Sequence, residues 1–139
     1  MRRPEAKFWD RVKRNLKKYP IFLNRIENAV GTGDPDVEAL ANGLCTKIEL
    51  KAVLSAPKRH DTPLLSGSHG TLQTQRNWHL EWQRHKGRSI FLVGVGSFTF
   101  YVIDGSYHDE LNDMTLEQMA DLSLCHDWPE LAQYLGVKL

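Results

Sequence analysis

Asp36, Glu49 and Lys51 bring together two carboxylates and one ammonium group, at a spacing typical of residues that act as a set. Asp36 directly follows Pro35, and Glu49 and Lys51 are two positions apart, so in an extended strand their side chains leave the same face. Carboxylate oxygens are the ligands that Mg²⁺ and Mn²⁺ prefer, and an ammonium group can offset the charge that develops on a reacting phosphate. The pattern therefore predicts a site for metal-assisted hydrolysis of a phosphate ester.

A hairpin signal lies between the two halves of this motif. The dipeptide Asn42-Gly43 is typical of a tight turn, which would place a strand that begins at Asp36 beside a strand over residues 45–54. The carboxylates and the lysine would then converge on one spot. Leu50 would point to the opposite face and into a core, and its backbone carbonyl could be a further metal ligand. The alternative is that these charges are simply solvated on the outer face of the hairpin, but the pairing of the two short motifs across a turn favours a site.

Three more polar residues are candidates for the same site. Glu5 lies on the inward side of an expected N-terminal helix and could reach the metal, although an acid in a first turn also stabilises a helix through its dipole. Glu27, on a strand expected over residues 21–30, is a rival that a strand-face ion pair would explain equally well. Gln75 is the one polar residue on the apolar face of a helix expected over residues 72–86. It could contact the attacking water or the scissile phosphate, or be a core amide bonded to backbone.

Charge is distributed unevenly although the net charge is only +1. Residues 1–88 contain 17 Lys and Arg against nine Asp and Glu, a net charge of +8, and residues 89–139 contain one Lys against eight acids, a net charge of −7. This asymmetry suits an anionic partner for the basic part, although solvated surface charge explains it as well. The candidates for phosphate contacts are Lys58, Arg59, Arg76, His79 and Arg84. The acidic segment over residues 104–130 carries no functional interpretation.

The elements that must position these residues follow from hydrophobic periodicity and turn signals. Helices are predicted over residues 4–18 and 72–86 and after the starts at Thr115 and Trp128, and strands over residues 21–30, 36–41, 45–54, 90–95 and 98–103. The order indicates one α/β domain with a mixed sheet flanked by helices, a core over about residues 4–104 and a helical extension over about residues 105–139. The solvent face of the first helix carries Lys7, Arg11, Arg14, Lys17 and Lys18, and Trp78 and Trp82 are expected in the core.

Composition argues against several other classes of protein. The hydrophobic fraction of 41% and charged fraction of 25% are ordinary for a globular domain, and no apolar run is long enough to span a membrane. The basic N-terminal segment lacks the apolar stretch of a signal peptide. Cys45 and Cys125 lack any metal-ligand spacing and are expected to be reduced thiols of a cytoplasmic protein. No glycine-rich phosphate loop is present, so no organic cofactor is expected. No membrane partner is expected either, because the sequence lacks a long apolar run.

Four segments resemble the PD-(D/E)xK nuclease superfamily, and within it the VRR-NUC (virus-type replication–repair nuclease) group and phage-type Holliday junction resolvases. They are the N-terminal helix with Glu5, RIENAVGTGDPDV at residues 25–37, KIELK at residues 47–51, and QRNWH at residues 75–79. The resemblance spans roughly residues 5–95. It departs from the VRR-NUC pattern before the second helix, where Ser-Pro is absent, so that Gln73 competes with Gln75.

The resemblance implies a restriction-endonuclease-like fold with an αβββαβ core. It implies that Asp36 and Glu49 bind Mg²⁺ or Mn²⁺ with help from the Leu50 carbonyl, and that Lys51 is the catalytic lysine. Glu5 matches the helix acid of many members, and Gln75 matches the glutamine of the subgroup.

The activity implied by the resemblance is that of a structure-selective DNA endonuclease of recombination or repair. Many members are homodimers that act on branched DNA such as Holliday junctions, which places the protein in the cytoplasm of a bacterium or a phage-infected host. Two alternatives stay open: a nuclease of the same chemistry that acts on nicked, flap or linear DNA, and a catalytically inactive DNA-binding module.

Overall fold

The computed structural model of the chain describes residues 3–26 and 33–139. Its helices are α1 (Pro4–Leu16), α2 (Gln73–Arg84), α3 (Leu116–Leu122) and α4 (Trp128–Tyr134), and its strands are β1 (Phe22–Arg25), β2 (Val37–Ala41), β3 (Leu44–Val53), β4 (Ser89–Val95) and β5 (Thr99–Asp104). Short 3₁₀ turns lie at Gly67–His69, Gly105–Tyr107 and Leu111–Asp113. The order of helices and strands predicted from the sequence is therefore confirmed.

The strands form one mixed sheet in the order β1-β2-β3-β4-β5. β3 pairs in parallel with β4, and all other neighbours are antiparallel. The hairpin predicted between β2 and β3 is confirmed, because Asn42 and Gly43 both take positive φ angles, of 53° and 80°, as a tight hairpin turn requires. The parallel pair needs a crossover connection, and α2 supplies it. β3 is thus the central strand on which the remaining elements are assembled.

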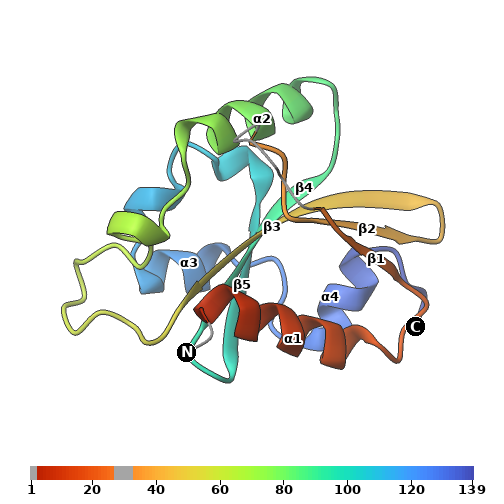
Figure 1. The fold of residues 1–139 in the computed structure, drawn as a ribbon, viewed down its shortest axis with the longest axis horizontal. Coiled ribbons are helices and arrows are strands. Elements are labelled where there is room, and N and C mark those ends of the chain that lie inside the picture. Colours follow the sequence, from red (N-terminus) through yellow and green to blue (C-terminus); the bar gives the residue numbers. More distant parts are fainter. Residues whose placement is uncertain (1–2, 27–32) are drawn as a thin grey trace.

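Helices cover both faces of this sheet (Figure 1). On one face, Ile48 and Leu50 of β3 pack with Phe8 of α1 and Leu131 of α4 in one hydrophobic cluster. On the other face, Phe91 of β4 packs in a second cluster, with side chains from α3 and from the segment between β3 and α2. Because side chains alternate along a strand, Glu49 and Lys51 lie on the second face, the side of α2 and α3.

Several element boundaries differ from the prediction. The first strand spans Phe22–Arg25, and the end predicted for it at residue 30, with Glu27, lies outside the described residues. β2 begins at Val37, so Asp36 precedes the strand. α2 spans Gln73–Arg84, and Lys86 has a φ of 65°, which is incompatible with continuing the helix. None of the helices among the described residues is long and apolar enough to cross a membrane.

The predicted positions of Arg11 and of the two tryptophans of α2 were wrong. Arg11 is buried, because the start of β5 lies against α1 and presents the Thr99 carbonyl to its guanidinium at 3.0 Å. Trp78 and Trp82 are only half-buried and belong to neither core cluster. Their rings stack on each other at a centroid distance of 5.0 Å, so each ring buries part of the apolar surface of the other without packing in the core.

The contact between α1 and β4 depends on a glycine. A Cβ built on Gly94 would lie 2.6 Å from a ring carbon of Phe8. We predict that Gly94→Ala lowers the free energy of unfolding by about 1–3 kcal/mol through overpacking, measured by urea denaturation. In the double variant with Phe8→Leu, the two losses should be less than additive. Equal stability of Gly94→Ala and the wild type would contradict the packing described.

Candidate active site

Asp36, Glu49 and Leu50 meet where β2 separates from β3. The last residue pair of this hairpin is Val37 with Ile48, so two residues later the Leu50 N–H has no strand partner on that side, and it donates to Asp36 Oδ2 at 2.9 Å. In a strand, the N–H and the carbonyl of one residue point toward the same neighbour, so the Leu50 carbonyl also faces Asp36. The structure therefore brings together the three groups that the sequence predicted as metal ligands.

The two carboxyl groups at this point are in contact and one of them is buried. Glu49 is only 1% exposed. Its pKa lies well above the usual value, first because burial disfavours the charged form, and then because the charge of Asp36 and a side-chain hydrogen bond with Asp36 favour a protonated carboxyl. The charge of Lys51 acts in the opposite direction. A proton or a cation between the two carboxyl groups would relieve this repulsion.

Gln75 connects the lysine to the buried carboxylate. Lys51 Nζ donates to Gln75 Oε1 at 3.2 Å and to the Gly70 carbonyl at 3.2 Å, and Gln75 Nε2 donates to Glu49 Oε2 at 3.2 Å. The Leu72 N–H donates to the same Gln75 oxygen at 2.8 Å, which fixes the orientation of the amide at the start of α2. Gln73 is exposed and contacts Asn77, so of the two glutamines it is Gln75 that lies at the site.

A glycine holds the segment before Asp36 against the first turn of α2. Gly33 has a φ of 82°, and a Cβ built on it would lie 2.2 Å from the Thr74 carbonyl oxygen. No side chain fits at this position. The close approach places Asp36 and Gln75 on two segments that touch, a contact that the sequence showed only as a glycine-containing turn.

Glu5 lies at the edge of the site. It stands in the first turn of α1 and lines a hollow with His69 and Ala52, the residue that follows Lys51. Its pKa is raised, mainly by burial and then by Asp36, while Lys51 lowers it. The structure therefore puts Glu5 within electrostatic reach of the other site residues, as expected from the sequence, and its role stays a prediction.

His79 was predicted as a phosphate contact, and the structure contradicts this because the side chain is fully buried between α2 and β4. Its Nδ1 lies 2.8 Å from Ser89 Oγ, and its Nε2 lies 3.9 Å from Glu49 Oε1. Burial lowers the pKa of His79 to about 4, so the ring is neutral near pH 7 and the contact with Glu49 is no ion pair. His79 lies on the same helix face as Gln75, so the apolar face predicted for this helix is the feature of the sequence that indicates its burial.

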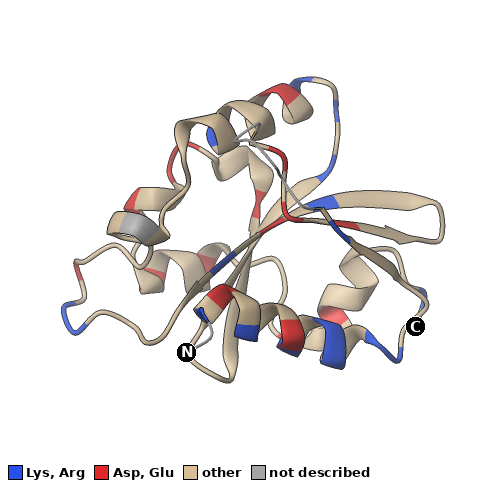
Figure 2. Ribbon diagram, viewed as in Figure 1, with Lys and Arg blue, Asp and Glu red and all other residues tan. Residues whose placement is uncertain are grey.

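The other predicted phosphate contacts lie in two places. Lys58 and Arg59 are exposed in the connection between β3 and α2, where Arg59 pairs with Asp61 at 3.2 Å. Arg76 is half-buried and Arg84 exposed on α2. Basic residues also gather along α1 (Figure 2). Whether any of them contacts a phosphate stays a prediction.

The residues at the site fit a divalent cation that keeps much of its water. The described residues contain no group of three or more His, Cys, Asp or Glu side chains that could hold a metal ion. Asp36 and Glu49 with the Leu50 carbonyl would be a partial set of oxygen ligands, and Mg²⁺ commonly completes such a set with water. Glu49 Oε1 is buried and accepts no hydrogen bond from any described residue, which leaves a carboxylate oxygen without a partner.

Comparisons with known proteins define the fold. No protein-family model matches the chain, and no curated protein is detectably similar to it in sequence. In three dimensions the chain is similar to Hjc, a Holliday junction resolvase from the archaeal hyperthermophile Archaeoglobus fulgidus, with a TM-score of 0.62 over 92% of this chain and 98% of that one, at 10% sequence identity. The restriction-endonuclease-like α/β fold expected from the sequence is thereby confirmed, whereas the narrower resemblance to the VRR-NUC group stays a prediction.

The lowered pKa of His79 makes the protein less stable in acid. An unfolded histidine binds its proton near pH 6.5 and this one near pH 4, so the stability is complete above pH 6.5 and is lost as the pH falls toward 4. We predict a loss of about 3 kcal/mol between pH 7 and pH 4 that is absent from His79→Gln, measured by urea unfolding at both pH values. A His79 ring resonance that titrates near pH 6.5 by NMR would contradict the burial described.

Proposed function

We propose that the protein is a divalent-metal-dependent endonuclease that hydrolyses phosphodiester bonds in DNA. The observation that carries the proposal is the buried contact between Asp36 and Glu49, with Lys51 joined to the same carboxylate through Gln75. A buried carboxylate such as Glu49, whose pKa is raised by burial and by a neighbouring carboxylate, is stable in its charged form when a cation lies between the two. The likeness of the fold to that of a Holliday junction resolvase supports the same reading.

Each residue of the site would have a distinct task. Asp36, Glu49 and the Leu50 carbonyl would hold Mg²⁺ or Mn²⁺, which supplies Lewis-acid polarisation of the scissile phosphate and acidifies water. Lys51 would orient the attacking water and stabilise the negative charge that develops on the phosphate, from a position fixed by Gly70 and Gln75. Gln75 would hold Lys51 and Glu49 in place, because its amide accepts a hydrogen bond from the lysine and donates one to the carboxylate.

The substrate we propose is branched DNA, bound by a homodimer. The structurally similar archaeal protein is a Holliday junction resolvase. Two active sites related by a dyad would suit a symmetric four-way junction. We further propose that the protein acts in the cytoplasm of a bacterium or a phage-infected host.

The assignment of Asp36 and Lys51 can be tested on a labelled four-way junction with Mg²⁺. We predict that Asp36→Asn lowers the cleavage rate about a thousandfold, since several kcal/mol of charge stabilisation are lost. Lys51→Ala should lower the rate at least about a hundredfold while the dissociation constant for DNA changes little. Lys47→Ala is a matched control, because it removes an equal charge from β3 at a lysine paired with Glu38 at 2.6 Å.

The same assay separates the chemistry from the choice of substrate. Junction, flap, nicked and linear DNA should be cut at different rates, with the junction first. Equal rates on all four would contradict the preference for branched DNA but not the nuclease assignment. Cleavage by Asp36→Asn at the wild-type rate would contradict the assignment itself, and DNA binding with no cleavage under any metal would favour the inactive module.

A further inference from the structure

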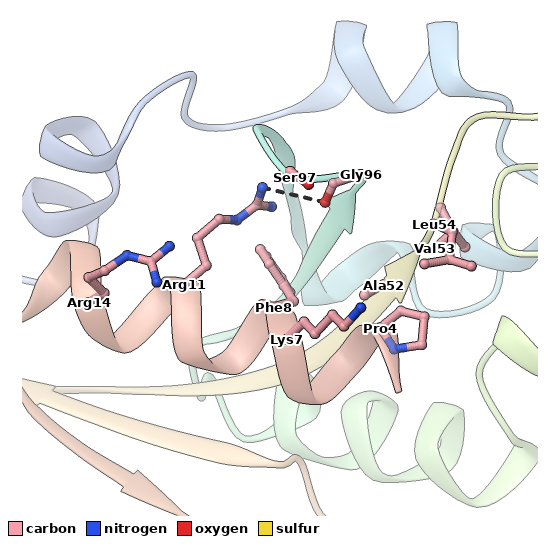
Figure 3. A pocket seen from close by; sticks show the side chains of 10 residues that line it. All are labelled: Pro4, Lys7, Phe8, Arg11, Arg14, Ala52, Val53, Leu54, Gly96 and Ser97. Atoms are coloured by element: carbon pink, nitrogen blue, oxygen red, sulfur yellow. Dashed lines mark hydrogen bonds between the residues drawn. The ribbon is translucent and has the colours of Figure 1, made fainter. Parts of the chain in front are cut away.

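A second cavity lies on the other side of the start of α1. It has a volume of about 210 Å³ and opens between α1, the end of β3 and the turn that joins β4 to β5. Lys7, Arg11 and Arg14 line it from α1, and Gly96 and Ser97 line it from the turn (Figure 3). No carboxylate is among the lining residues. The volume corresponds to several water molecules, at about 30 Å³ each, and is ample for a phosphate group.

Arg11 is the residue that points to a ligand. It is 8% exposed, and its guanidinium donates only to neutral backbone carbonyls, those of Thr99 at 3.0 Å and Gly96 at 3.5 Å. Its Nε is buried and has no hydrogen-bond partner among the described residues. Burial and the nearby charge of Arg14 lower its pKa. Buried charges in proteins are normally paired with an opposite charge, so a buried arginine beside two further cations lacks a counter-ion.

The position of the cavity relative to the candidate active site suggests the source of that anion. The cavity shares Pro4 and Ala52 with the hollow that contains Glu5 and His69. Ala52 follows Lys51 directly in β3, but its side chain leaves the face of the sheet that packs against α1, opposite to that of Lys51. The cavity therefore lies on the α1 face and adjoins the candidate active site through the hollow around Glu5, a residue whose pKa is affected by the charges of Lys51 and Asp36.

We propose that this cavity binds a non-scissile phosphate group of the DNA strand, held by Lys7, Arg11 and Arg14. The inference rests on the proposed function, because it takes the bound strand to pass through the candidate active site. Arginine forms paired hydrogen bonds with phosphate oxygens, and Arg11 is already fixed in place by the two backbone carbonyls. Lys7 and Arg14 are exposed at the rim and would close around the phosphate from solvent.

Binding without turnover tests the site. The probe is a fluorescent four-way junction titrated with protein in EDTA at several salt concentrations. The double variant Lys7→Gln and Arg14→Gln changes only exposed side chains, so folding should be preserved. We predict about tenfold weaker binding, and a slope of log affinity against log salt that is smaller in magnitude by about 0.9, the value for one lost phosphate contact.

The matched control is Lys13→Gln with Lys17→Gln, which removes the same charge from exposed positions of the same segment that do not line the cavity. Equal losses in the two double variants would overturn the proposal, because they would reflect overall charge. Wild-type binding by the Lys7 and Arg14 variant would overturn it as well.

Single uncharged methylphosphonate linkages then locate the phosphate in the strand. Wild-type affinity should fall about tenfold at one position near the cleaved bond, and the Lys7 and Arg14 variant should be insensitive there. The proposal would be overturned if no methylphosphonate position weakened binding while inorganic phosphate still competed with DNA, because the cavity would then take free phosphate. These readouts need no cleavage. If cleavage depends on Asp36 but the Lys7 and Arg14 variant binds DNA like the wild type, only the cavity inference fails. If that variant binds as predicted but the wild type cleaves no DNA, only the nuclease assignment fails.

Discussion

The contact between the carboxyl groups of Asp36 and Glu49 is the interaction that the rest of the structure must accommodate. Glu49 is buried, and its neighbour carries the same charge, so the pair favours a proton or a cation. Lys51 offsets only part of the repulsion, since its ammonium group is bonded to Gly70 and Gln75. Two adjacent carboxyl groups destabilise the fold when no cation is present, and the simplest explanation for keeping them together is that they bind a cation.

The sheet produces this contact through the point at which two strands separate. β2 leaves β3 after the pair of Val37 and Ile48, so that Leu50 is free to bond with Asp36. Gly33 allows the segment before β2 to touch α2, and α2 in turn presents Gln75. The overall fold of the chain is similar to that of an archaeal resolvase at 10% sequence identity, so a similar backbone arrangement is formed by very different sequences.

Local features of the sequence predicted the hairpin and the alternation along β3, because a turn at Asn42-Gly43 and a period of two residues are set by neighbours in the chain. They did not predict the burial of Arg11, which depends on the Thr99 carbonyl 88 positions away. They also led to the wrong assignment of His79 as a phosphate contact, since its partner Ser89 becomes a neighbour only when α2 packs on β4. Both errors concern polar side chains whose tertiary partners are backbone or hydroxyl groups, which leave no pattern of charge or periodicity.

Calorimetric titration of Mn²⁺ into the protein without DNA tests whether the pair of Asp36 and Glu49 binds a divalent cation. In buffers of different ionisation enthalpy we predict binding accompanied by proton release that increases as the pH is lowered, because the cation and a proton compete for the Glu49 carboxyl, whose pKa is raised by burial and by Asp36. Asp36→Asn and Glu49→Gln should each weaken binding at least about tenfold. Binding of Mn²⁺ by Glu49→Gln with unchanged affinity and unchanged proton release would show that Glu49 does not hold the metal.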